Sequence, residues 1–189
     1  MTHADRKRKP GRPRSDQSRQ AILQASLDLV REIGYPATTV EGIAARAGTG
    51  KQTIYRWWRS RADIVLEALN ATATREIPLP DTGSLSGDLL EFLRATFVAG
   101  RRAGTVPVLR ALMAQAQHDP EFHTEFESKF LRRRREVLVD VLRRHPDELR
   151  VPVPIAVDVV FGVLWYRILA THGPLDAALA RHLTALLVQ

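Results

Sequence analysis

The sequence predicts an all-helical fold of about nine helices, in which a small three-helix unit precedes a larger helical unit. Apolar residues recur at helical spacing along most of the 189 residues, and no stretch alternates convincingly with the period of a strand. Glycine and proline recur between the predicted helices, as at Gly34, Gly48, Gly104 and Gly173-Pro174. A turn-rich segment at 77–83 separates the two units, which we place at 15–76 and 84–189.

The first unit is preceded by a basic tail. Residues 1–14 are rich in Pro and Gly and contain six Lys and Arg residues, so we predict a disordered basic arm. Its Gly11-Arg12-Pro13 core is similar to the AT-hook, which places arginines in a narrow minor groove. The alternative is a solvated tail that adds only nonspecific affinity. A helix is predicted from Ser15 to Ile33, before the stop at Gly34.

Two short helices joined by a glycine turn follow. Thr38 or Thr39 can cap the first of them, and Gly48 can end it because glycine adopts the left-handed conformation without a Cβ penalty. The second helix begins near Gly50 and exposes the polar and basic side chains Lys51, Gln52, Thr53 and Arg56. This pattern is a helix-turn-helix, whose second helix lies in a DNA major groove. A fourth helix begins at Ser60, where Ser60-x-x-Asp63 predicts a capping box.

A longer pattern around this motif resembles the DNA-binding domain of the TetR/AcrR transcriptional regulators. The matching residues are Thr39, Val40, Ile43, Ala44, Ala47, Gly48, Lys51, Thr53, Ile54, Tyr55, Trp57, Trp58, Ser60, Arg61, Asp63 and Ile64. Gly50 departs from the family, which usually has a Ser or Thr at the cap of this helix. The resemblance covers residues 15–70. It implies a helix-turn-helix DNA-binding domain at 15–76 and a helical ligand-binding and dimerisation domain at 84–189.

The motif and the resemblance together predict which residues contact double-stranded DNA. Family positions that contact phosphates correspond to Thr39, Lys51, Tyr55 and Trp57, and Gln52 is suited to reading adenine. The full predicted set is Arg12, Arg14, Thr38, Thr39, Thr49, Lys51, Gln52, Thr53, Tyr55, Arg56 and Trp57.

The charge distribution supports a polyanionic partner for the first unit only. Residues 1–75 contain 14 Lys and Arg against 7 Asp and Glu, whereas residues 76–189 contain 14 of each kind. The whole excess of +7 therefore lies on the helix-turn-helix part of the chain.

Composition and missing motifs argue against several other classes of protein. The chain has no cysteine, which excludes disulfides and cysteine-based metal sites and fits a cytoplasmic location. There is no Gly-x-Ser-x-Gly or His-Glu-x-x-His motif, so we expect no enzyme activity, no metal and no cofactor. A phosphate-binding loop at 48–51 is unsuited, because its first glycine would fall at Ala45 and its magnesium-binding Ser or Thr at Gln52. The most apolar stretch, 151–171, is interrupted by Asp158 and Arg167, so we expect no membrane span.

In the second unit we predict helices near 85–102, 106–117, 120–144, 154–171 and 174–188. The helix at 154–171 is apolar nearly all round, so one of its faces needs a partner beyond its own core. With the last helix it looks like the surface through which TetR-family subunits pair as homodimers. The predicted interface residues are Val160, Leu164, Leu179, Leu183 and Leu186. The alternative is that both helices are plain core.

The resemblance also implies a small-molecule pocket between the helices of the second unit. Candidate wall residues are Phe92, Phe97, Leu109, Met113, Gln117, Phe126, Phe130, Trp165 and Tyr166. Arg133 falls on the face that carries Phe130 and Val137, where an arginine is costly unless paired. It can extend to solvent, pair with an acid such as Asp158, or face an anionic group in a cavity, so we include it among the ligand-binding candidates.

Two functions follow from these observations. The first is a repressor that binds a palindromic operator as a homodimer and is released by a small molecule. The alternative is an architectural DNA-binding protein without a ligand. The large neutral second unit favours the first function.

Overall fold

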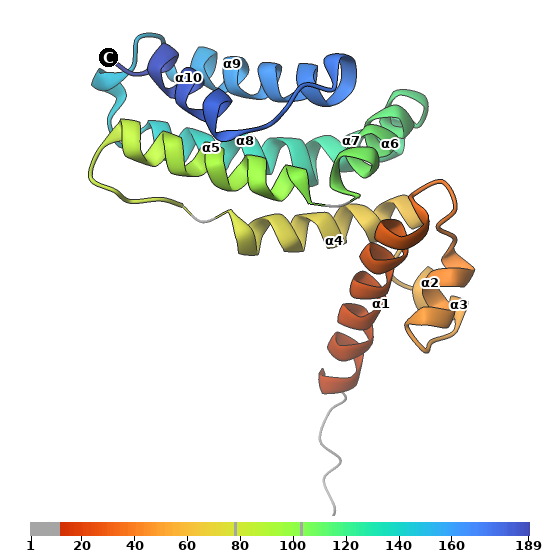
Figure 1. Ribbon diagram of the computed structural model, residues 1–189. Helices are drawn as coiled ribbons and strands as arrows, with labels where there is room; N and C mark the ends of the chain where they lie inside the picture. The colour runs from red at the N-terminus through yellow and green to blue at the C-terminus, as the bar shows by residue number, and fades with distance from the viewer. Residues whose placement is uncertain (1–11, 78, 103) are drawn as a thin grey trace, which may run out of the picture.

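The computed structural model describes residues 12–77, 79–102 and 104–189, which are helical almost throughout (Figure 1). The helices are α1 (Arg12–Ile33), α2 (Val40–Arg46), α3 (Lys51–Tyr55), α4 (Arg61–Glu76), α5 (Leu85–Arg101), α6 (Thr105–His118), α7 (Pro120–Phe126), α8 (Arg132–Leu142), α9 (Val153–Tyr166) and α10 (Ala177–Leu187). In the described residues the only β-type pairing is an isolated bridge between Leu149 and Val188. The predicted all-helical class is confirmed.

Helix α4 lies between the first three helices and the C-terminal bundle (Figure 1). Helix α1 packs against α4 and α2, while in the bundle α5 packs against α8 and α10 and α8 packs against α9. Buried apolar side chains from both parts of the chain form one continuous core. The helices that carry the helix-turn-helix are therefore joined to the C-terminal bundle by packed side chains.

Local signals explain most helix ends. Ser60 and Asp63 form the predicted capping box at the start of α4, and Asp119 caps α7 ahead of its Pro120. Helix α10 begins at Ala177, three residues later than expected, because the Asp176 side chain accepts a hydrogen bond from the Leu179 backbone N–H at 2.8 Å.

The start of α1 differs from the prediction. Helix α1 begins at Arg12 rather than Ser15, so residues 12–14, expected to be disordered, belong to its first turn. Residues 1–11 lie outside the described part of the chain.

The predicted helix at 120–144 contains a wider turn in its middle. Between α7 and α8 the residues Glu127–Leu131 form a π-helical segment, η1. Apart from Val141, the buried residues of this stretch are four positions apart: Phe122, Phe126, Phe130, Arg134, Leu138 and Leu142. A regular α-helix has 3.6 residues a turn, so such a stripe would drift around it, and the wider π turn reduces that drift. A similar π segment, η3 (Arg167–Thr171), extends α9.

A buried carboxylate attaches the linker before α5 to α8. Asp88 accepts hydrogen bonds from the Thr82 backbone N–H at 2.6 Å and hydroxyl at 2.8 Å, and from Arg144 at 3.3 Å. Burial alone would raise the pKa of Asp88. The hydrogen bonds from Thr82 and Arg144 outweigh that effect and hold the pKa below its ordinary value. The ionised Asp88 therefore stabilises the junction between the two parts of the chain.

Candidate DNA-binding surface and internal cavity

The turn between α2 and α3 depends on glycine at two positions. Gly48 has φ +64°, in the left-handed region that ends α2, and its N–H bonds to the Ala45 carbonyl at 3.2 Å. Gly50 has an extended backbone and is the N-cap residue of α3, where the sequence predicts the helix to begin. Because it is a glycine, it forms no side-chain cap. Lys51, Gln52 and Arg56 are consequently exposed on one side of α3, while Ile54 is buried.

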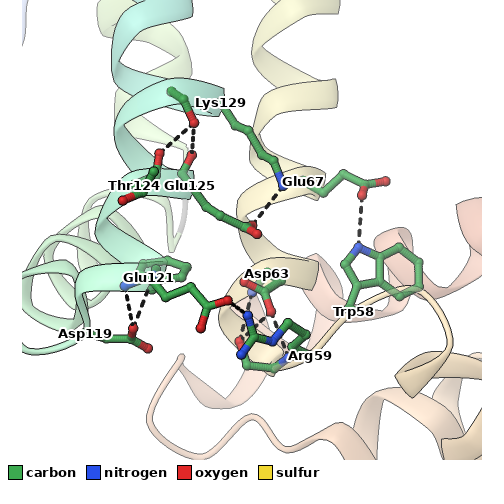
Figure 2. Close-up of polar contacts among 12 residues, drawn as sticks. Trp58, Arg59, Asp63, Glu67, Asp119, Glu121, Thr124, Glu125 and Lys129 are labelled. Atoms are coloured by element: carbon green, nitrogen blue, oxygen red, sulfur yellow. Dashed lines mark hydrogen bonds and ion pairs between the residues drawn. The ribbon is translucent and has the colours of Figure 1, made fainter.

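Trp58 anchors the segment just after α3 to α4 and α1. Its indole Nε1–H donates to Glu67 Oε2 at 2.9 Å, and the ring is buried (Figure 2). Arg19 of α1 pairs with the same Glu67 at 2.8 Å and lies over the Trp58 ring at 5.9 Å. These contacts hold the recognition helix α3 in a defined orientation relative to α1 and α4.

Several predicted phosphate contacts are exposed beside α3. Thr39 caps α2 by accepting the Gly42 N–H at 3.0 Å, and its exposed hydroxyl retains a proton to donate. Tyr55 is exposed, and Arg56 lies over the half-buried Trp57 ring at 4.9 Å. Lys51 pairs with Glu41 at 3.1 Å across α2 and α3, but an exposed pair of this kind is weak and a phosphate can displace it.

Five other residues predicted to contact DNA are buried, half-buried or part of helix α1. Thr38 has 0% of its surface exposed and donates its hydroxyl to the Gly34 carbonyl at 2.9 Å, so its side chain cannot reach DNA. Arg12 and Arg14 belong to a helix, which contradicts the extended AT-hook-like conformation for this part of the arm. Thr49 and Thr53 are half-buried at the start of α3.

Sequence reasoning missed the role of Arg61 and Tyr35 between α1 and α2. Arg61 Nη1 donates to the carbonyl oxygens of Tyr35, Pro36 and Thr38, at 3.3, 3.1 and 2.6 Å, and its guanidinium lies over the Tyr35 ring. The Tyr35 hydroxyl donates to Gln115 Oε1 of α6 at 3.2 Å. Burial raises the pKa of Tyr35, so it remains a neutral donor. Arg61 is part of the family pattern, but that pattern does not indicate its contacts with the backbone of residues 35–38. Nothing in the sequence pairs Tyr35 with Gln115.

A second bridge joins the helix-turn-helix to the C-terminal bundle at α7. Arg59, in the turn after α3, forms an ion pair with Glu121 in the first turn of α7 (Figure 2). Asp119 holds that turn by accepting the N–H groups of Glu121 and Phe122 at 3.1 and 3.0 Å. A shift of α7 would therefore act directly on the turn that follows the recognition helix.

A cavity of about 430 Å³ lies where the two parts of the chain meet. Its wall includes Leu27 and Val30 of α1 and Leu69 and Ala73 of α4, together with residues of α5, α6, η1, α8, the α9–η3 helix and the turn between α5 and α6. The volume is within the usual range of small-molecule sites. A molecule in this cavity would touch helices of the DNA-binding part itself.

Half of the predicted ligand-binding residues line this cavity. Those that do are Phe92, Leu109, Met113, Phe130 and Trp165. Phe97 and Phe126 are instead buried in the core away from it, and Gln117 and Tyr166 are exposed.

Of the three alternatives for Arg133, the structure shows extension to solvent, so Arg133 is not among the residues that line the cavity. It is exposed and lies in a hollow on the surface, beside Glu136. The buried arginine is the next residue, Arg134, which lies in the cavity wall. Asp158, offered as the partner of Arg133, pairs with Arg135 at 2.5 Å. The π turn at η1 favours the four-residue spacing from Phe130 and thus places Arg134 inward.

Most residues of the predicted dimer interface are core residues of their own chain. Val160, Leu164, Leu179 and Leu183 are buried, whereas Leu186 is 60% exposed. The exposed large apolar side chains of α9, η3 and α10 are Ile155, Tyr166, Leu169 and Leu186. We call these four residues the α9–α10 apolar surface. Of the five predicted interface residues, Leu186 alone is exposed in the protomer.

The α9–η3 helix also has the composition of a membrane span. Val153–Thr171 is long and apolar enough to cross a membrane by length and composition alone, a test that core helices of soluble proteins also pass. Only 33% of the most apolar stretch of this helix is buried within the protomer, which agrees with a helix that has one face on the core and one face free. Among the described residues, no group of three or more His, Asp or Glu side chains is placed to hold a metal ion.

Comparison with known proteins agrees with this architecture. Residues 22–68 match the bacterial regulatory proteins of the tetR family, and residues 79–187 match the tetracyclin repressor-like C-terminal domain. The chain is 34% identical over 181 residues to the HTH-type transcriptional regulator YdeS of Bacillus subtilis, a match that covers 93% of this chain and 90% of that protein.

Solved structures show the same fold. The TetR family regulator SCO0332 superposes with a TM-score of 0.78 at 28% identity, over 89% of this chain and 95% of that one. FadR of Bacillus subtilis, solved in complex with stearoyl-CoA, has a TM-score of 0.69 at 18% identity, over 90% of this chain and 97% of that one. The family consists of transcriptional regulators rather than enzymes. This chain belongs to the TetR family of helix-turn-helix transcriptional regulators.

Proposed function

We propose that this regulator is a repressor that binds a palindromic operator as a homodimer in the cytoplasm and is released by a small molecule. The observation that carries the proposal is the cavity of about 430 Å³, whose wall is shared between the C-terminal bundle and helices α1 and α4 of the DNA-binding part. An architectural protein without a ligand has no need of such a cavity.

Release requires that the ligand favour a conformation with misplaced recognition helices. A ligand shifts an equilibrium only as far as its affinities for the two states differ. Two sets of contacts support such a coupling. The cavity touches Leu69 and Ala73 of α4 directly, and Tyr35–Gln115 and Arg59–Glu121 join the helix-turn-helix part to α6 and α7 of the bundle. The coupling is reciprocal, so operator DNA weakens ligand binding by the same factor that ligand weakens operator binding.

Dimerisation is proposed through the α9–α10 apolar surface. Two recognition helices must be held about 34 Å apart to enter successive major grooves of one operator. Three large apolar side chains exposed along the α9–η3 helix, and a fourth on α10, are typical of an interface rather than of a solvated face. Within each protomer, the proposed DNA contacts are Thr39, Thr49, Lys51, Gln52, Thr53, Tyr55, Arg56 and Trp57.

A footprint on the DNA upstream of the protein's own gene tests the proposal. A short symmetric protected site that disappears on adding a bound small molecule supports a ligand-released repressor. Uniform protection that no molecule changes would instead indicate the architectural function. A thermal-shift screen of small molecules supplies the candidates.

We expect Gln52→Ala to relax base preference at one operator position. Gln52 is exposed on α3, and a bidentate Gln–adenine contact contributes about 1–3 kcal/mol of discrimination. Affinities for operators mutated at each position, measured by fluorescence anisotropy, locate the effect. Tyr55→Phe is the matched control, because removing a phosphate contact weakens binding to every sequence alike. Equal reductions on operator and random DNA for Gln52→Ala would contradict its reading role.

The basic arm is expected to contribute salt-dependent affinity. Replacing Arg6, Lys7, Arg8 and Lys9 by Gln leaves α1 intact and should reduce the slope of log affinity against log salt by about 0.9 for each phosphate that these side chains neutralise. Arg132→Gln, on the exposed side of α8, should leave the slope unchanged. An unchanged slope for the fourfold variant would show that the arm does not touch DNA.

A further inference from the structure

Arg134 is a buried cation without a counter-ion. It lies in the cavity wall with 8% of its surface exposed, and its Nε and Nη1 atoms have no hydrogen-bond partner among the described residues. The charge that acts on it is that of Arg133, another cation. Burial lowers the pKa of Arg134, and repulsion from Arg133 lowers it further, so its environment opposes its charge.

Two other arginines of α8 each have an acidic partner. Arg132 pairs with Glu127 at 2.8 Å on the surface, and Arg135 pairs with Asp158 at 2.5 Å at the edge of the cavity. A guanidinium remains protonated in proteins, so burying one without a partner costs free energy that an apolar residue would not cost. Arg134 therefore has the properties of a group whose partner is absent from the free protein.

The rest of the cavity wall limits what that partner can be. Most of the wall is apolar, with Leu27, Phe92, Leu109 and Trp165 among its residues. Thr96 of α5 supplies one more buried polar atom without a partner, its hydroxyl Oγ1. The wall also carries Arg31, Arg102 and the Arg135–Asp158 ion pair, so its charged side chains are mostly cationic. A mostly apolar wall with an excess of cationic side chains suits a molecule with one small anionic head and an apolar body.

We propose that the effector is an amphipathic anion whose carboxylate, or similar oxygen-rich head of low charge, pairs with Arg134. The planar guanidinium matches a carboxylate in geometry, and a charge-assisted hydrogen bond away from water is stronger than a neutral one. This inference rests on the proposed effector function of the cavity and specifies the chemical class of the effector. Binding then supplies the missing counter-ion, so the pairing itself favours the ligand-bound state.

Matched acids and alcohols test the charge requirement. The probes are decanoate with decanol, and 2-naphthoate with 2-naphthylmethanol, which differ within each pair only in the head group. Titration calorimetry should show at least about tenfold tighter binding of the acid by the wild-type protein in one of the pairs, equivalent to about 1.4 kcal/mol. Arg134→Met should abolish that preference while keeping affinity for the alcohol, and Arg134→Lys should retain part of it.

Arg133→Met is the matched control, since it removes the same charge one residue away, outside the cavity. It should leave the preference for the acid unchanged. The unfolding midpoint of the ligand-free Arg134→Met variant should be no lower than that of the wild type, because an unpaired buried charge is replaced by an apolar chain of similar length. A lower midpoint would show that the charge of Arg134 is already satisfied, and would overturn the inference.

The outcomes separate the effector class from the proposed function. Equal binding of acid and alcohol by the wild type, or failure of every probe to bind, overturns the inference that the effector is an anion. If the alcohol binds and releases the operator, the proposed repressor function nevertheless stands. Conversely, acid binding that depends on Arg134 but does not change operator affinity supports the anionic site and contradicts ligand release.

Discussion

Leu186→Asp is expected to convert the regulator to monomers and to lower operator affinity about a hundredfold or more. Leu186 is 60% exposed on α10, so in the proposed dimer the new carboxylate would be buried at the interface without a partner. A monomer presents a single recognition helix, and without the second binding event affinity falls by a factor of about 10² to 10⁴. Sedimentation equilibrium measures the first effect and anisotropy on operator DNA the second.

Val98→Asp is the matched control for this substitution. Val98 is a similarly exposed apolar residue, at 50%, but it lies on a face of α5 that carries the charged residues Glu91 and Arg94. Its replacement should change neither assembly nor operator affinity. Leu183→Asp is unsuited to the test, because Leu183 is 4% exposed within its own chain and a charge there would unfold the protomer. A Leu186→Asp protein that remains dimeric would place the interface elsewhere.

Trp58→Ala is expected to reduce the free energy of unfolding by about 3–5 kcal/mol, the usual cost of truncating a large buried aromatic residue. Trp58 is buried between α1 and α4, and its truncation also leaves Glu67 without the indole hydrogen bond. This is a large part of the total stability of an ordinary domain. The measurement is urea denaturation of the variant and the wild type, with operator affinity determined at a temperature where both are folded.

The neighbouring Trp57 provides the comparison. Trp57 is half-buried beside the DNA-binding surface, where it contacts Arg56 and the edge of Trp58. Trp57→Ala should cost clearly less stability than Trp58→Ala but weaken binding to operator and random DNA alike, because its proposed contact is with phosphate. If Trp57→Ala proves the more destabilising of the two, the division between a core residue and a DNA-contacting residue is wrong.

The elements that the sequence determined by itself are those specified by neighbouring residues. Helix caps such as Ser60 with Asp63, the left-handed glycine at Gly48 and the apolar periodicity of α2 all act within a few positions of the chain. The helices and the turn of the helix-turn-helix are specified by such local signals, which is why its place and the family could be predicted. Charge counting likewise located the positive excess without any coordinates.

The tertiary structure alone decided which members of an apolar set face a cavity, a core or solvent. Periodicity identifies the face of a helix but not the depth of the packing on it, so Phe126 and Phe130 looked equivalent although only Phe130 lines the cavity. Periodicity also could not distinguish Leu183 from Leu186 as interface residues. In the structure Leu183 is buried within its own chain and Leu186 is exposed.

Arg133 and Arg134 show the remaining limit of sequence reasoning. Both positions, three and four residues after Phe130, are compatible with one α-helical face, so the pattern alone could not choose between them. The π turn of η1 and the packing of α8 on α9 placed Arg134 inside and Arg133 outside. A local sequence pattern specifies that a helix forms, whereas the way its turns are wound against neighbouring helices depends on contacts between residues far apart in the chain.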